Sequence, residues 1–231
     1  LGGNFFGVRT PVSYDEDAQA YFDALEAASG WSEPSDYVAK KTAISNYFTA
    51  LKADSNFTDI KALYIPIWQA AGPNAINAVN PGTYNLTFSG TVTHNAGDYI
   101  YSDGTTGYAT APFQGPASSN PKFFEIGSAS AGCNILNTTT ENNKAAYGWY
   151  GFFALHPRWN SAVSALYWLN TTYNGLSSDG TTNGLWTSNS ITPDGGDTNK
   201  GQLWRNGSSQ GTSTSGSGTG SNTNANVADI A

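Results

Sequence analysis

The chain has 231 residues, of which 39% are hydrophobic and 12% are charged, and its formal net charge is −7. The charged share is half the usual value of about 25%, and 24 Ser, 25 Thr and 23 Asn take the place of the missing charges. Ten Lys and Arg, scattered along the chain, do not form the basic surface that a nucleic-acid partner requires. No apolar run approaches the ~20 residues of a membrane-spanning helix, so we also expect no membrane insertion.

The titratable residues predict neither a metal nor a cofactor. A single cysteine, Cys133, excludes an intrachain disulfide framework and a cysteine-based metal cluster. His94 and His156 stand far apart and show no metal-ligand spacing. Asp-Gly pairs such as Asp103-Gly104 and Asp179-Gly180 supply oxygen atoms that suit calcium. They lack the dense Asp/Asn alternation of a calcium loop, which favours turn formation instead.

Residues 13–55 predict two antiparallel helices. Acidic residues follow Ser13, where they suit the positive end of a helix dipole, and Gly30 ends the first pattern. The second helix is expected to begin at Ser35-Asp36. Residues 56–63 predict a short third helix. The apolar positions at helical spacing are Ala18, Phe22, Leu25 and Ala28 in the first helix and Val38, Ile44, Phe48 and Leu51 in the second.

From about Tyr64 the apolar residues alternate, which predicts short strands bounded by Gly, Asn, Asp or Pro. The expected strands lie at 84–88, 100–102, 108–110, 123–126, 148–155, 165–169, 184–187 and 202–205. Asn206-Gly207 predicts a two-residue hairpin turn. The polar run 207–224 suits a flexible linker, or a long hairpin whose returning strand is 226–228. The fold class is therefore mainly β, preceded by a small α-helical hairpin module.

The acidic residues argue against an enzyme. Glycosidases with a β-sandwich use two carboxylates about 5–9 Å apart, commonly two residues that alternate on one strand. Glu125 and Glu141 are too far apart in the sequence to share a strand in this way, and most Asp residues stand beside Gly, as turn formers do. The chain also lacks the Gly-x-Ser-x-Gly elbow of serine hydrolases. We expect no catalytic residues.

Aromatic residues are the remaining candidates for binding. A sugar site combines ring stacking with hydrogen bonds from Asn or Asp side chains. Trp159 and Trp186 stand beside polar residues, which suits the rim of a sandwich, and Asn189 follows Trp186 closely. These three residues are the predicted glycan-binding set. The alternative for every Trp in this half is a place in the core, which is the better interpretation for Trp168 and Trp204 because of their apolar neighbours.

Several segments resemble bacteriophage virion structural proteins in which a helical module precedes a concanavalin A-like (laminin-G-like) jelly roll. The similar segments are 17–26, 41–54, 60–68, 80–88, 102–108, 184–187 and 203–208. The resemblance implies an N-terminal arm and helical module over 1–63 and a concanavalin A-like β-sandwich over 64–231. Such proteins continue beyond the strand at Asn226-Val227, so it also implies that the final strands follow Ala231 or that another chain covers the open edge.

The same resemblance implies a role on the outer surface of a virion, as a tail fibre, spike or capsid decoration that contributes to host attachment. The implied partners are other virion proteins, further copies of the chain in a homo-oligomer such as a trimer, and host-surface glycans. The alternative is a lectin-like glycan-binding adhesin module. A polysaccharide-degrading enzyme is disfavoured because the carboxylate pair is missing.

Overall fold

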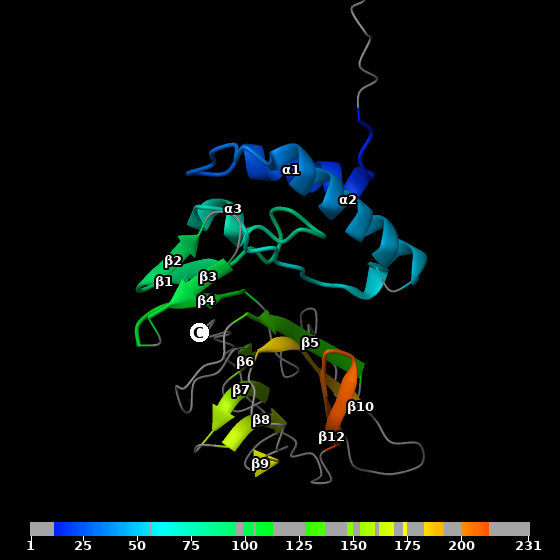
Figure 1. Cartoon of the computed structure of the whole chain (residues 1–231), viewed down its shortest axis with the longest axis vertical. Helices are drawn as coiled ribbons and strands as arrows, with labels where there is room; N and C mark the ends of the chain where they lie inside the picture. Colours follow the sequence, from blue (N-terminus) through cyan, green and yellow to red (C-terminus); the bar gives the residue numbers. More distant parts are fainter. Residues whose placement is uncertain are drawn as a thin grey trace, which may run out of the picture.

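The computed structural model describes residues 12–55, 57–95, 99–103, 105–112, 128–136, 147–149, 153–159, 162–168, 173–174, 183–191 and 200–212. Its elements in chain order are α1 (Glu16–Glu26), α2 (Tyr37–Ala53), the 3-10 turn η1 (Phe57–Asp59), α3 (Ala71–Ala75), β1 (Thr87–Ser89), β2 (Val92–Asn95), β3 (Tyr99–Ser102), β4 (Tyr108–Thr110), β5 (Ser128–Ile135), β6 (Tyr147–Trp149), β7 (Phe153–Trp159), β8 (Ala162–Trp168), β9 (Tyr173–Asn174), β10 (Gly184–Ile191), β11 (Lys200–Arg205) and β12 (Ser208–Thr212). Figure 1 shows the helices at one end of the molecule. The expectation of a mainly β chain with N-terminal helices is confirmed.

Helix α1 begins later than Ser13 because Asp15 provides its N-cap. The Asp15 carboxylate accepts hydrogen bonds from the backbone N–H groups of Asp17 at 3.0 Å and Ala18 at 3.3 Å. Phe22 and Leu25 are fully buried, as their spacing predicts, and the chain reverses near Gly30 in the left-handed conformation. The predicted helix is therefore confirmed, with a start three residues later than expected and an end at Glu26, so that Ala28 lies beyond the helix.

Helix α2 buries Ile44 and Phe48, which confirms its predicted apolar face in part. The prediction for Val38 is wrong, because this side chain is 61% exposed and its neighbour Tyr37 occupies the buried position. The expected third helix over 56–63 amounts, among the described residues, to the single 3-10 turn η1. None of the described helices is both long and apolar enough to cross a membrane.

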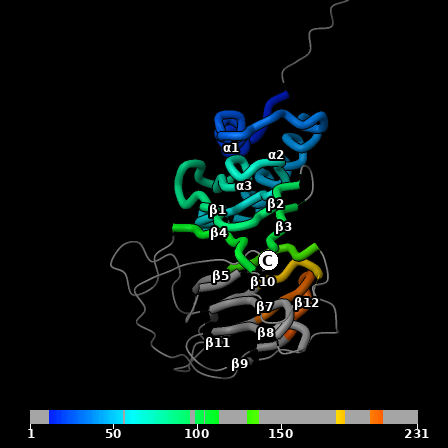
Figure 2. Tube along the Cα trace, turned by 90° about the vertical axis from the view of Figure 1, so that its left-hand side faces the viewer, coloured from blue at the N-terminus to red at the C-terminus, as the bar shows by residue number. Residues whose placement is uncertain are grey.

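The core of the helical end includes residues well beyond position 63. Trp68, Ile76 and Ala78 are buried in the same cluster as the apolar faces of α1 and α2. Trp31 and Trp68 meet edge to face, with their ring centroids 5.4 Å apart. Figure 2 shows α3 between the helical pair and strands β1–β4. The packing unit at this end therefore extends to about residue 79, past the boundary that the resemblance implies.

The described strands form antiparallel sheets. Two of these sheets have four strands, in the orders β12-β11-β10-β5 and β6-β7-β8-β9, and β11 packs against β8. Two further sheets, β1-β4 and β2-β3, have two strands each. Most predicted strands coincide with observed ones, although the expected strand 123–126 lies outside the described residues. Strands β2, β5, β9 and β12 have no counterpart among the predicted segments.

The predicted Asn206-Gly207 turn is confirmed. Both residues have positive φ, 48° and 77°, as the type I′ turn between antiparallel strands requires. Arg205 pairs with Ser208, so the returning strand is β12, inside the polar run. The suggested return at 226–228 lies outside the described residues.

Candidate functional site

The structure places Trp186 in the interior, so its prediction as a rim residue is wrong. Its side chain is fully buried, and the guanidinium carbon of Arg205 lies 5.5 Å from its ring centroid. Leu185, one residue earlier, is 53% exposed. Successive side chains in a strand point to opposite faces, and in β10 the polar neighbours of Trp186 gave a false indication of which face meets solvent. A ring covered in this way cannot stack on a sugar.

Trp159 and Asn189 lie in different sheets. Trp159 is the last residue of β7 and pairs with Ala162 of β8. Asn189 lies in β10, between Ser130 of β5 and Gln202 of β11. Their side chains lie outside the described part of the structure, as do Glu125 and Glu141. Their predicted role in glycan binding stays a prediction.

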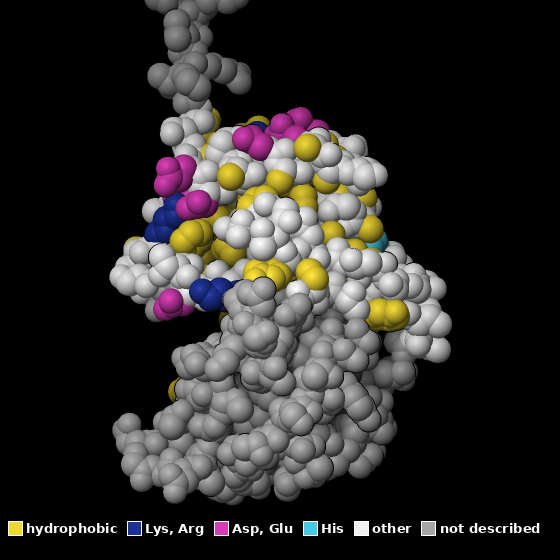
Figure 3. Space-filling model, turned by 180° about the vertical axis from the view of Figure 1, so that it is seen from behind, with side chains coloured by type: hydrophobic (Ala, Val, Ile, Leu, Met, Phe, Trp, Pro, Cys, Tyr) yellow, Lys and Arg dark blue, Asp and Glu magenta, His cyan; other side chains and the backbone are white. Residues whose placement is uncertain are grey.

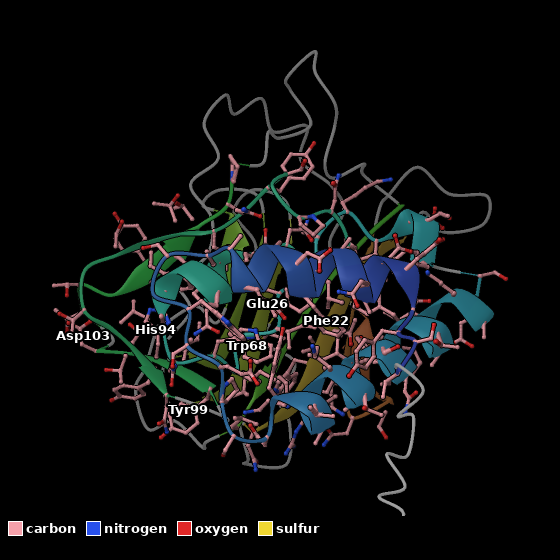
Figure 4. The ribbon with its side chains drawn as sticks, turned by 90° about the horizontal axis from the view of Figure 1, so that it is seen from above. Phe22, Glu26, Trp68, His94, Tyr99 and Asp103 are labelled. Carbon is pink, nitrogen blue, oxygen red and sulfur yellow. The ribbon has the colours of Figure 1, made fainter. Side chains whose placement is uncertain are left out.

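Strands β1–β4 form one long, kinked β-hairpin, which we call the 87–110 hairpin. In its outer half Asn95 pairs with Tyr99, and in its inner half Ser89 pairs with Tyr108. The pairing shifts by three residues between the two halves. The extra residues form a turn that begins at Asp103, and this turn lies at the edge of the molecule (Figure 4).

The Asp103 carboxylate organises that turn. Its Oδ1 accepts hydrogen bonds from the N–H groups of Thr105, Thr106 and Gly107 at 2.8–3.0 Å, and its Oδ2 accepts one from the Thr106 hydroxyl at 2.6 Å. The Thr106 hydroxyl, followed by these backbone donors, holds the pKa of Asp103 well below its ordinary value. The prediction that this Asp-Gly pair serves turn formation is confirmed.

The two faces of the 87–110 hairpin differ. Phe88 and His94 lie on the inner face, with their ring centroids 4.7 Å apart. On the outer face Tyr101 is 58% exposed and Tyr108 is 40% exposed. Residues 62–121 contain no Lys or Arg. The outer face therefore offers phenol rings and neutral polar groups, without a positive charge from its own segment.

Asn74 joins the inner face of the hairpin to the helical end. This side chain is 1% exposed, and it hydrogen-bonds to both backbone groups of Trp68, accepting from the N–H at 2.8 Å and donating to the C=O at 2.6 Å. Its amide nitrogen also lies 2.9 Å from Nδ1 of His94. Burial lowers the pKa of His94.

Asn77, which is fully buried, uses the complete hydrogen-bonding capacity of its side chain. Oδ1 accepts from the N–H groups of Leu63 and Val79, and Nδ2 donates to the carbonyls of Lys61 and Thr83. These bonds hold residues 61–63 against the chain that follows α3. Asn77 is therefore a structural residue.

The charged groups of the helical end also have structural partners. Nζ of Lys52 lies 2.8 Å from Oδ1 of Asp15 and 2.5 Å from Oδ2 of Asp17. Burial alone would raise the pKa of Asp15, but the hydrogen bonds from Lys52, Ala18 and Asp17 outweigh it, so the pKa lies below its ordinary value. Figure 3 shows acidic side chains gathered over this end.

Lys41 occupies an aromatic cage. Its Nζ lies 4.4 Å from the ring centroid of Tyr37, 5.3 Å from that of Tyr14 and 5.8 Å from that of Phe22, with Glu26 at 3.7 Å. A cation over the face of an aromatic ring is attracted by the electron density of that face. Lys41 therefore packs over the edge of the apolar core that contains these rings.

Neither a reactive thiol nor a cluster of metal ligands is found among the described residues. Burial raises the pKa of Cys133 to about 12, which keeps the thiol protonated and weakly nucleophilic. Within the described ranges, no three His, Cys, Asp or Glu side chains come together as metal ligands. What the arrangement does offer is an exposed surface for binding.

Sequence reasoning missed Asn74 and Asn77. The sequence did contain an indication of their role, because both amides stand in an otherwise apolar stretch between Ala70 and Val79. A polar group buried in such a stretch must find hydrogen-bond partners. The partners come from distant segments, and no periodicity in the sequence indicates them.

No family model, curated protein or solved structure matches the chain.

Proposed function

We propose that the chain is a non-catalytic structural protein on the outer surface of a bacteriophage virion. It serves as a tail fibre, spike or capsid decoration and contributes to host attachment. Its β-rich part is proposed to be a concanavalin A-like jelly roll, and its helical end is proposed to dock onto other virion proteins or onto further copies of the chain. The resemblance in the sequence supplies this identity.

One observation carries the non-catalytic part of the proposal. Four described polar side chains that could take part in chemistry are engaged in structural bonds instead: Asp15 caps α1, Asp103 closes a turn, and Asn74 and Asn77 tie segments together. An enzyme holds at least one such group toward a substrate instead. A protein whose purpose is to hold its shape has no need to do so.

The helical end supports the docking part of the proposal. Lys40 and Lys41 turn toward the rings of Trp68 and Tyr37, so these two charges are withdrawn from the outer side of α2. Val38 and Tyr47 are exposed on that helix, at 61% and 46%. These two residues lie on opposite flanks of α2, and the exposed side between them carries the uncharged residues Ala39, Ala43, Asn46 and Ala50. A helix side without charges suits contact with another protein surface.

Purified particles test this proposal. Phage particles are purified from a bacterial culture in which the gene for this chain is present. They are separated on a density gradient, and the fractions are analysed by mass spectrometry. We expect peptides of this chain to sediment with the particles, and gold-labelled antibodies to mark the particle exterior in electron micrographs. Recovery of the chain only in particle-free fractions would exclude a virion role.

A second candidate function, glycan binding, is favoured by the outer face of the 87–110 hairpin. Tyr101 and Tyr108 present exposed rings, and Thr93 beside Tyr101 and Ser89 beside Tyr108 supply hydroxyl groups. Stacking of a sugar on a phenol ring, together with hydroxyl hydrogen bonds, is the usual chemistry of a neutral glycan site. The absence of Lys and Arg from residues 62–121 favours a neutral glycan over an anionic one.

Binding to extracted host polysaccharides tests the second candidate. If the hairpin binds, Tyr101→Ala and Tyr108→Ala each weaken binding by about tenfold, the effect of losing about 1.4 kcal/mol. Tyr47→Ala, which removes an exposed ring from α2, is the matched control and leaves affinity unchanged. Loss of binding in Trp159→Ala alone would place the site at the end of β7 instead.

A further inference from the structure

His94 and Asn74 form a polar contact between the 87–110 hairpin and the helical end. His94 belongs to β2, and Asn74 belongs to α3, which packs against α1. Seen from above, His94 lies between Trp68 and the turn at Asp103 (Figure 4). Nδ1 of His94 lies 2.9 Å from the amide nitrogen of Asn74.

The backbone of Trp68 fixes which way the Asn74 amide points. Its oxygen faces the Trp68 N–H at 2.8 Å, and its nitrogen faces the Trp68 carbonyl at 2.6 Å. A flipped amide would set two acceptors against each other at one contact and two donors at the other. The second hydrogen of Nδ2 therefore points to His94, whose Nδ1 must accept. His94 is neutral in this arrangement, with its proton on Nε2.

Protonation of His94 is incompatible with this contact. A proton on Nδ1 would face the Asn74 N–H, so two donors would oppose each other, and the amide cannot turn without losing both bonds to Trp68. The edge-to-face contact with Phe88 adds an apolar neighbour, and burial lowers the pKa of His94. The contact is therefore complete above the ordinary histidine pKa of 6.5 and is lost as the pH falls through the lowered value.

Among the described residues, no other ionisable group competes for this role in the elements around His94. Strand β1, helix α3 and the segment 66–70 contain no titratable residue, and β2 contains only His94. In β3 the register partner of His94 is Ile100, and the tyrosines on either side, Tyr99 and Tyr101, alternate to the opposite face. Within the part of the chain that the structure describes, the response to acid at this contact therefore belongs to the histidine.

We propose that His94 and Asn74 are an acid-sensitive latch, which holds the β2–β3 half of the 87–110 hairpin on the helical end at neutral pH and releases it on acidification. The other half stays attached by a different contact, since Leu86 and Ala109 are buried and the Leu86 N–H donates to the Ala75 carbonyl at 2.8 Å. Acid thus loosens one half of the hairpin, which carries the exposed Tyr101, without unfolding the molecule. This inference does not depend on the virion role.

Hydrogen exchange of the full chain at pH 7.5 and pH 5.0 tests the latch, after correction for the intrinsic exchange rates. We expect exchange at the amides of residues 92–95 and 99–102 to increase at pH 5.0, by up to about thirtyfold, the limit set by the distance of pH 5.0 below the ordinary histidine pKa. His94→Gln keeps an acceptor for Asn74 but does not titrate, so its exchange is independent of pH. His156→Gln removes the other histidine and should respond to acid as the native chain does.

The titration of the native chain provides a second measurement. The C2 proton resonance of His94, assigned with the two variants or by isotope labelling, should titrate below 6.5. Titration at or above 6.5, or an acid response that persists in a folded His94→Gln variant, would overturn the latch.

Discussion

The indole N–H of Trp68 donates a 2.8 Å hydrogen bond to the phenol oxygen of Tyr21, and both side chains are buried. This bond joins α1 to the segment that leads into α3, 47 positions later in the chain. Trp68 also binds Asn74 through its backbone, and Asn74 binds His94. A continuous series of hydrogen bonds therefore runs from the first helix to the hairpin.

Tyr21→Phe should destabilise the helical end. The change removes the acceptor and leaves the Trp68 N–H buried without one, which costs about 1–3 kcal/mol. Urea unfolding followed by circular dichroism measures the loss. Tyr47→Phe is the matched control, because the Tyr47 ring is 46% exposed and its hydroxyl can bond to water. Equal stability of the two variants would show that the buried bond contributes nothing.

Asp15 should make stability depend on pH. Its pKa is lowered in the folded state from the ordinary value of 3.8, so its contribution is complete above that value and is lost as the pH falls through the lowered pKa. Asp15→Asn keeps the cap but loses the charge, so it should cost about 0.5–1 kcal/mol at pH 7. The difference in the free energy of unfolding between Asp15→Asn and the native chain should shrink toward pH 2.

Two further variants identify the source of that effect. Asp15→Ala also removes the cap, and should cost about 1 kcal/mol more than Asp15→Asn at every pH. Asp36→Asn breaks the ion pair with Lys40, in which the Asp36 side chain is 57% exposed, and should cost about 0.5 kcal/mol or less. A gap between the native chain and Asp15→Asn that stays constant from pH 7 to pH 2 would contradict the assignment.

Local patterns in the sequence predicted those elements whose causes are local. The face of α1 with Phe22 and Leu25 follows from a spacing of three and four residues, and Asn206-Gly207 follows from the positive φ that a tight turn requires. Each depends on neighbours a few positions away. The structure confirms both.

The errors have non-local causes. Which face of β10 is buried depends on the neighbouring layers, so the polar residues after Trp186 did not reveal that the ring is covered. Asn74 takes part in the core only because Trp68 and His94 converge on it. The exposed pair Tyr101 and Tyr108 emerges from the shifted pairing around Asp103, which no alternation of residues reports.

Gly207→Ala should weaken the β11–β12 hairpin. Gly207 has φ = 77°, a conformation in which an L residue with a Cβ costs about 1 kcal/mol or more. A built Cβ would meet no neighbouring atom within 4 Å, so the cost is conformational and not a clash. Hydrogen exchange of residues 200–212 should increase about fivefold for 1 kcal/mol.

Asn206 and Ser208 provide the comparison for that turn. Asn206→Gly tolerates the positive φ but loses the 2.8 Å bond from the Leu185 N–H to Oδ1 of Asn206, so it should also increase exchange, and at Leu185 in particular. Ser208→Ala changes an exposed side chain and should leave exchange as it is. A response of Ser208→Ala as large as that of Gly207→Ala would show that the turn geometry is not the cause.

Lys41→Gln should destabilise the helical end through the loss of its cation. Nζ lies within 6 Å of the centroids of Tyr37, Tyr14 and Phe22, and the side chain is 19% exposed, so the cation is largely shielded from water. Removal of a partly desolvated cation from an aromatic ring costs about 1–2 kcal/mol.

Two further variants serve as controls for Lys41→Gln. Lys41→Arg keeps the charge and should lose less stability, whereas Lys61→Gln removes a charge from an exposed residue and should change stability by no more than about 0.5 kcal/mol. Thermal unfolding at low and high salt separates the causes, because salt screens the pair with Glu26 far more than the contact with the rings. Equal stability of Lys41→Gln and Lys61→Gln would show that the contacts of Lys41 with the three rings do not stabilise the fold.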